Sequence, residues 1–147
     1  MRILIAEDEP VSRELLEKLL LDMGYEVVPT CDGNEAWETL KSPKAPSLVI
    51  LDWMMPGMDG VEVCRRVRDL QTEVRPYIIL LTGKEAEKNL VVGMSAGADA
   101  YVTKPVGPEE LTVLAREGQR IVEMQIEMLN AKRNLREQVE ILRKELR

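Results

Sequence analysis

Acidic residues stand at the ends of two short apolar runs, where they could do chemistry together. Asp52 ends the run 48–51 (Leu-Val-Ile-Leu), and Glu7 with Asp8 ends the run 3–6 (Ile-Leu-Ile-Ala). Four consecutive aliphatic residues predict a strand that is buried on both faces of a parallel sheet. The carboxyl ends of such strands form the edge where open α/β sheets bind ligands. Three neighbouring acids repel one another unless a cation lies between them, so a metal-assisted site is the first hypothesis.

The composition limits the class of protein. A chain of 147 residues with 45% apolar residues suits one domain with a real core and a short appendage. The absence of histidine excludes zinc fingers, histidine-based catalytic triads and haem ligation through histidine. Cys31 and Cys64 have no motif spacing and are expected to be reduced thiols. The net charge of −6 argues against broad nucleic-acid binding.

The sequence also carries predictions about location. The chain enters its first predicted strand within two residues, which leaves no room for a signal peptide. No apolar run approaches the length of a membrane span. We therefore expect a cytoplasmic protein without a membrane contact.

Short apolar runs alternate with amphipathic segments, which is the pattern of βαβ units and a parallel sheet. Strands are predicted over residues 2–6, 26–29, 47–51, 76–81 and 100–102. Helices are predicted from residue 10 to a stop at Gly24, and then over 34–41, 60–70 and 86–96. Five strands, each followed by a helix, predict a doubly wound α/β domain of three layers. The periodicity does not determine the strand order.

The fifth predicted helix begins at Pro108 and has no stop signal before the C-terminus. Apolar residues recur every seven positions, at Leu114, Ile121, Met128, Leu135 and Leu142. A continuous helix over 108–147 would measure roughly 60 Å, far longer than the domain it leaves. A helix with one exposed apolar stripe favours a partner, so we predict a parallel dimer, with a frayed monomeric tail as the alternative. Gly118 weakens a helix and is a candidate hinge between domain and coiled coil.

Taken in order, these motifs match a known family. The series consists of Glu7-Asp8, Asp52 with Met55-Pro56-Gly57-Met58-Asp59-Gly60, Thr82, and Lys104-Pro105. It resembles the receiver domain of two-component response regulators over about residues 1–120. The resemblance implies a flavodoxin-like five-stranded parallel sheet with strand order 2-1-3-4-5. Residues 121–147 would then be a helical, coiled-coil extension, either a tail of a stand-alone regulator or a linker to a further effector domain.

The resemblance also implies a magnesium site. Asp52 would be the phosphoacceptor, which a sensor histidine kinase, a phosphotransfer protein or a small phosphodonor would phosphorylate. Asp8, Asp52 and the backbone carbonyl of Met54 would ligate Mg²⁺, and Glu7 would act through a metal-bound water. Such a regulator catalyses only its own phosphorylation and dephosphorylation, and no motif of an effector enzyme or DNA-binding element is visible in the tail. We therefore do not expect an enzyme with an outside substrate.

Three more residues receive roles from the resemblance. Lys104 and Thr82 would each contact a phosphoryl oxygen, and the bond between Lys104 and Pro105 would be cis. Tyr101 resembles the switch aromatic of the family, whose ring turns inward when Thr82 moves. The expected output is a homodimer through the surface of the fourth helix, fifth strand and fifth helix, continued by the C-terminal helix.

Other interpretations remain open for single residues and for the whole chain. Asp8 could cap a helix that starts at Pro10, and Asp59 is better explained as a helix cap than as a ligand. An aspartyl phosphatase would need a second acid where this chain has Met54, and a nucleotide site would need a glycine-rich loop after the first strand. The alternative function is that of a non-phosphorylated pseudo-receiver that serves only as a dimerisation scaffold. Lys84 would lie near the mouth of the site.

Overall fold

Short buried strands alternate along the chain with amphipathic helices, and the computed structural model describes residues 1–83 and 90–146. The strands are β1 (Arg2–Ala6), β2 (Glu26–Thr30), β3 (Leu48–Asp52), β4 (Tyr77–Thr82) and β5 (Ala100–Thr103). The helices are α1 (Pro10–Asp22), α2 (Gly33–Leu40), α3 (Gly60–Asp69), α4 (Leu90–Ser95) and α5 (Pro108–Glu145). All strand pairs are parallel and the order is β2-β1-β3-β4-β5, which confirms the predicted doubly wound fold.

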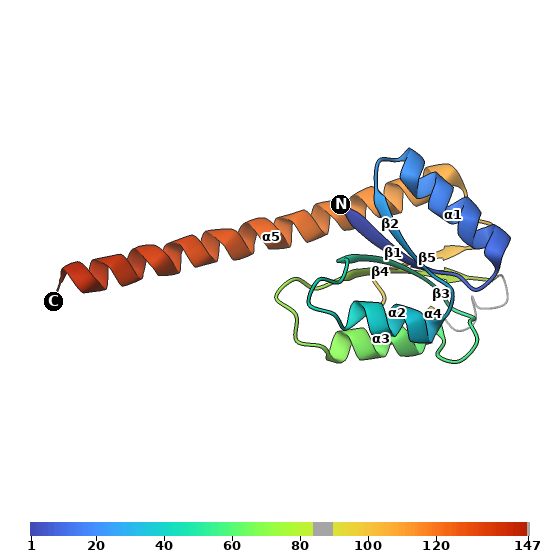
Figure 1. The fold of residues 1–147 in the computed structure, drawn as a ribbon, viewed down its shortest axis with the longest axis horizontal. Coiled ribbons are helices and arrows are strands. Elements are labelled where there is room, and N and C mark those ends of the chain that lie inside the picture. The colour runs from blue at the N-terminus through green and yellow to red at the C-terminus, as the bar shows by residue number, and fades with distance from the viewer. Residues whose placement is uncertain (84–89, 147) are drawn as a thin grey trace.

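Helices cover both faces of the sheet, α1 and α5 on one side and α2, α3 and α4 on the other (Figure 1). Successive side chains of a strand point to opposite faces, so each central strand supplies two cores. In β3, Leu48 and Ile50 pack in the core under α1 and α5, whereas Val49 and Leu51 pack in the core under α2 and α3. Every residue of β3 is buried, which explains why its sequence is apolar without alternation.

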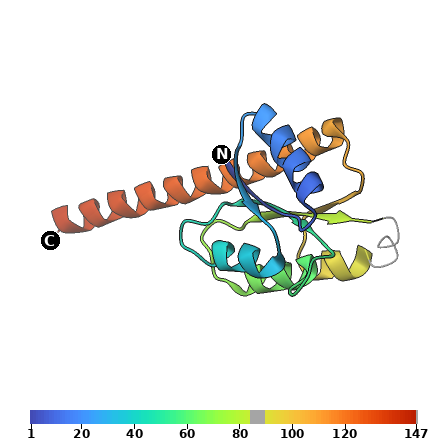
Figure 2. The ribbon, with the colours of Figure 1, turned by 45° about the vertical axis from the view of Figure 1, so that its right-hand side comes forward.

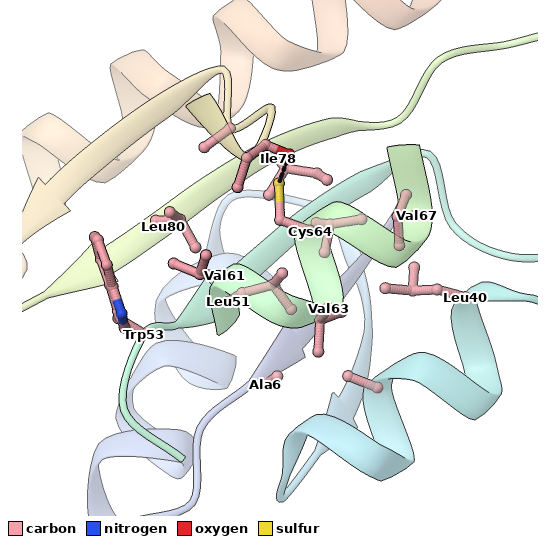
Figure 3. Packing of buried hydrophobic residues seen from close by; sticks show 14 of the residues in the cluster. Ala6, Leu40, Leu51, Trp53, Val61, Val63, Cys64, Val67, Ile78 and Leu80 are labelled. Atoms are coloured by element: carbon pink, nitrogen blue, oxygen red, sulfur yellow. Dashed lines mark hydrogen bonds between the residues drawn. The ribbon is translucent and has the colours of Figure 1, made fainter. Parts of the chain in front are cut away.

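The core under α2 and α3 consists of aliphatic side chains around Trp53 and Cys64 (Figure 3). The Sγ atom of Cys64 lies 3.5 Å from the carbonyl oxygen of Ala96, and burial raises the pKa of this thiol to about 11. Both cysteines are free, Cys64 in this core and Cys31 at the surface. The predicted reduced state of the thiols therefore agrees with the structure.

The element ends differ from the predicted ends in ways that have physical causes. Strands β3 and β4 each lie one residue later than predicted, and they end at Asp52 and Thr82 because these residues still pair with Leu81 and Thr103 of the neighbouring strands. The side chain that caps α1 belongs to Glu9, which accepts hydrogen bonds from the first-turn amides, so the idea that Asp8 caps this helix is wrong.

Two other helix predictions had different outcomes. Asp59 caps α3 as predicted, with Oδ1 accepting from the amide of Glu62 at 2.8 Å. The fourth helix was expected to begin at residue 86, but residues 86–89 lie outside the described part of the chain. Its described portion runs from Leu90 to Ser95.

Helix α5 is continuous over its whole length and leaves the domain as a long rod (Figures 1 and 2). Gly118 lies inside this helix, and a Cβ atom there would come within 2.5 Å of Tyr77 and 2.6 Å of Leu48. Gly118 is therefore a close-packing position, and the predicted hinge is not present. The last buried residue of α5 is Val122. Within the two described stretches, no helix has both the length and the apolarity needed to cross a membrane.

Candidate functional site

The sheet topology brings the three predicted acids together. Asp52 is the last residue of β3, and Glu7 and Asp8 follow β1, the strand that pairs with β3. Oxygen atoms of these three carboxylates all lie within 4.8 Å of one another. Glu7 and Asp52 are buried, with 2% and 5% of their surface exposed, while Asp8 is exposed. Two buried acids and an exposed one thus share the carboxyl edge of the sheet.

Lys104 reaches the same place from the end of β5. Its Nζ donates to Oε2 of Glu7 at 2.7 Å and to Oδ2 of Asp52 at 2.9 Å. The bond between Lys104 and Pro105 is cis, as predicted. The backbone amide of Lys104 also donates to the carbonyl of Thr82 at 2.7 Å, which joins the residue to the end of β4. A single ammonium group therefore bridges two carboxylates from different strands.

The charges at this edge do not balance. Burial raises the pKa of Asp52 to about 6, Lys104 opposes that rise, and the nearby Glu7 adds to it. Burial works against the charge on Lys104, but its hydrogen bonds to Glu7 and Asp52 prevail and raise the pKa of the lysine. Three acids facing one lysine leave a net negative site of oxygen donors, and such donors are what Mg²⁺ prefers. The residues present therefore fit a magnesium ion.

The two predicted switch residues lie on the neighbouring strands. Thr82 ends β4 and is buried, and its hydroxyl donates to the carbonyl of Val102 over a long 3.5 Å. Tyr101 lies on β5, pairs with Leu80 across the ladder, and has 41% of its surface exposed. Thr82 therefore shares the edge with Asp52, whereas the side chain of Tyr101 lies at the protein surface.

The loop after β3 contains a contact that the sequence reasoning missed. Trp53 is held at both ends, because its amide donates to Leu81 and its carbonyl accepts from Gly60, each at 2.9 Å. A Cβ at Gly60 would lie 2.3 Å from the carbonyl oxygen of Asp52, so only glycine allows α3 to start this close to the acid. The available signal was a glycine directly after the capping Asp59. Met54 lies in this loop with an exposed side chain, and Lys84 lies outside the described residues.

Comparisons with known proteins agree with this geometry. Residues 3–116 match the model of the response regulator receiver domain. The chain is 40% identical over 110 residues to the alkaline phosphatase synthesis transcriptional regulatory protein PhoP of Bacillus subtilis, covering 75% of this chain and 45% of that protein. It is 39% identical over 131 residues to the phosphate regulon transcriptional regulatory protein PhoB of Pseudomonas aeruginosa, covering 86% of this chain and 57% of that protein. The chain thus spans about half the length of these relatives.

A solved structure adds a magnesium-containing relative. The receiver domain of a sensor histidine kinase from Pseudomonas aeruginosa PAO1, with a magnesium ion coordinated in its active-site cleft, superposes with a TM-score of 0.72 at 27% identity. The match covers 80% of this chain and 95% of that one. With the edge-of-sheet acids, the lysine and the strand order in place, this chain belongs to the response regulator receiver domain family.

Proposed function

We propose that this chain is a Mg²⁺-dependent phosphoacceptor that relays a kinase signal, with Asp52 as the residue that becomes phosphorylated. The observation that carries the proposal is the cluster of three carboxylates at the sheet edge, with the ammonium of Lys104 at 2.9 Å from Asp52. A buried carboxylate with both a cation site and a lysine beside it suits attack on an anionic phosphoryl group, since charge neutralisation is most of what phosphoryl transfer requires.

The transfer itself exchanges one bond for another. A carboxylate oxygen of Asp52 attacks the phosphorus of a phosphohistidine in a sensor kinase or phosphotransfer protein. A P–O bond forms while the P–N bond breaks, and the electron pair of that bond stays on the imidazole nitrogen, which is then free to take a proton. Asp8, Asp52 and the Met54 carbonyl would hold Mg²⁺, with Glu7 acting through water, and the ion would neutralise charge on the phosphoryl oxygens. The positive charge of Lys104 would stabilise a further phosphoryl oxygen.

The proposed switch lies in Thr82 and Tyr101. The hydroxyl of Thr82 loses little by leaving its 3.5 Å contact, so a phosphoryl oxygen on Asp52 offers it a stronger partner. Movement of Thr82 opens space for the half-exposed ring of Tyr101, and this repacking changes the surface of α4, β5 and α5. The partner that we propose for this surface is a second copy of the chain.

Helix α5 supports the same proposal, because it exposes large apolar side chains that the domain does not cover. Leu135 and Leu142 are 61% and 57% exposed, and Val139 and Leu146 lie on the same stripe. We propose that about residues 1–120 form the receiver and that 121–147 form an extension that pairs in parallel with the same helix of a second copy. Phosphorylation on Asp52 would favour one arrangement of that dimer.

The test is intact mass after incubation with acetyl phosphate and Mg²⁺. We expect one added phosphoryl group in the wild type, none in Asp52→Ala, and none when Mg²⁺ is chelated. The matched control is Asp69→Ala, which removes an exposed aspartate remote in sequence from the cluster and should be phosphorylated like the wild type. If the wild type gains no mass from acetyl phosphate or from any of a panel of histidine kinases, the chain is a dimerisation scaffold and not a phosphoacceptor.

A further inference from the structure

Helix α5 stays in contact with its own domain beyond the last residue that the sheet buries. Its domain-facing positions recur every three or four residues, and the buried ones are Leu111, Ala115, Gly118 and Val122. The same face continues through Gln125, Leu129 and Arg133. Gln125 and Leu129 are half-buried, whereas residues 126–128 between them are exposed. The helix therefore has a contact surface about three turns longer than its buried part.

The partner of this surface is the segment that leads into β4. The side-chain amide of Gln125 makes two hydrogen bonds with the backbone of Arg75: its Oε1 accepts from the amide at 2.7 Å, and its Nε2 donates to the carbonyl at 3.0 Å. One turn further on, Leu129 lines a groove of about 550 Å³ together with Leu70 and Val74. After another turn, Arg133 forms an ion pair with Glu73. Three successive turns of α5 thus face residues 70–75, the first and third through direct polar interactions and the middle one across the groove.

The segment itself is tied firmly to the rest of the domain. The guanidinium of Arg75 donates to Oδ1 of Asp99 at 2.6 Å. The other oxygen of Asp99 accepts from Arg68 at 2.7 Å and from the amide of Ile78 at 2.8 Å. Arg68 also donates to the carbonyl of Gly97 at 2.9 Å. Through Asp99, the residue just before β5, the segment that holds α5 is therefore connected to the junction of α4 and β5.

We propose that residues 73–75 act as a clasp that holds α5 to the receiver as far as Arg133, so that the free stalk begins there and not at the end of the buried core. Gln125 is the positioning residue of this clasp. At 100° per residue, Leu135 and Leu142 lie roughly a third of a turn around the helix from the clasp, whereas Val139 and Leu146 lie nearer to its face. All four residues lie beyond Arg133, so a second copy can pair with α5 past the end of the clasp.

The consequence of the clasp rests on the proposed function. A shift at the α4–β5 junction would reach the dimer through Asp99, Arg75 and Gln125. Without the clasp, α5 would be free to bend after Val122, and the orientation of the receiver would not determine the arrangement of the stalk. With it, the domain and about three further turns of helix move as one body.

Hydrogen exchange by mass spectrometry tests the clasp on the full chain. The stalk is first made monomeric with Leu135→Lys and Leu142→Lys, checked by light scattering, so that protection cannot come from a second copy. We expect amides of 123–133 to exchange at least about tenfold more slowly than those of 136–145, since tertiary contacts and not helix propensity protect them. Protection that ends at Val122 would overturn the proposal.

A substitution in the same monomeric background identifies the clasp as the cause. Gln125→Ala removes both hydrogen bonds to Arg75 and should speed exchange over 126–133 about tenfold. The matched control is Glu127→Ala, an equally helix-favouring change at an exposed position of the same turn, which should leave exchange unchanged. Equal exchange in the two variants would overturn the proposal. Phosphorylation of Asp52 is scored separately by mass, so a failure of the clasp and a failure of the proposed function are distinguishable.

Discussion

At the carboxyl edge of the sheet, charged groups are buried against one another, whereas along α5 beyond Val122 apolar groups face solvent. Glu7 and Asp52 are 2% and 5% exposed, and Leu135 and Leu142 are 61% and 57% exposed. Each arrangement is unfavourable for the isolated chain, because buried like charges repel and exposed apolar stripes remain in water. Under the proposed function each would be relieved by binding, of a cation and a phosphoryl group at the edge and of a second copy along the helix. The two regions therefore differ in what could stabilise them: cationic and phosphoryl groups at the acidic edge, and an apolar surface along the helix.

The largest expected effect comes from removing one positive charge from the acidic site, compared with removing one from the exposed helix. Lys104→Met removes the ammonium that bridges Glu7 and Asp52, and we expect the rate of phosphorylation by acetyl phosphate to fall about a hundredfold or more. Lys144→Met removes an ammonium from the exposed helix and should leave that rate unchanged. Rates are read by intact mass over time, with Tm measured for both variants. A Lys104 variant within about fivefold of the wild type would contradict the proposed role of the lysine.

The next prediction concerns substitutions that disrupt the exposed apolar stripe of α5 and leave the acidic site intact. Leu135→Lys together with Leu142→Lys should weaken dimerisation about a hundredfold, since burial of leucines in a coiled coil is lost and like charges are added. The Tm of the receiver should not change. Sedimentation equilibrium measures the dissociation constant. Asn130→Lys with Asn134→Lys adds the same two charges to exposed positions away from the stripe, and equal weakening in that control would show that charge alone, and not the stripe, matters.

A pH-dependent prediction follows from the raised pKa of Asp52, about 6 against an ordinary value of 3.8. The folded protein without Mg²⁺ binds a proton more tightly than the unfolded chain, so this group contributes stability below about pH 4 that is lost as the pH rises through 6. Asp52→Asn should therefore raise the free energy of unfolding by about 1–3 kcal/mol at pH 7 and by little at pH 4.

Urea titrations at the two pH values, without and with Mg²⁺, measure this difference. Added Mg²⁺ should reduce the difference in free energy of unfolding between the variant and the wild type at pH 7, because it binds the folded wild type more strongly than the variant. A difference of the same size at pH 4 and pH 7 would mean that the charge on Asp52 is not its cause.

The smallest expected effect compares two positions of the same helix. Gly118→Ala should lower the free energy of unfolding by about 1–2 kcal/mol although alanine favours helix, because its Cβ would overlap the ring of Tyr77. Asn130→Ala, on the exposed part of α5, should raise it by about 0.5 kcal/mol. Urea denaturation gives both values. Stabilisation by Gly118→Ala would show that the helix can move away from the sheet there.

Most of the fold could be predicted from the sequence because the signals for strands and helices are local. A run such as Leu48–Leu51 predicts a buried strand by itself, and the motif series from Glu7 to Lys104 led to the family, the strand order and the candidate site residues. The ends of elements were less predictable. Asp52 and Thr82 belong to their strands because partners across the ladder continue the pairing, which no local pattern records. Glu9 caps α1 with a side chain longer than those usually found at that position.

The sequence by itself determined the alternation of strands and helices, the acids and lysine available for chemistry, and the seven-residue repeat of the last helix, because each depends on neighbours along the chain. Only the tertiary structure decided that the ammonium of Lys104 lies within 3 Å of carboxylate oxygens of both Glu7 and Asp52. It also decided that Gly118 is a packing position and that Gln125 bonds to the backbone of Arg75. These contacts join residues about 40 to 100 positions apart, and their geometry arises from how strands pair and how α5 lies across the sheet. Short-range periodicity cannot contain that information.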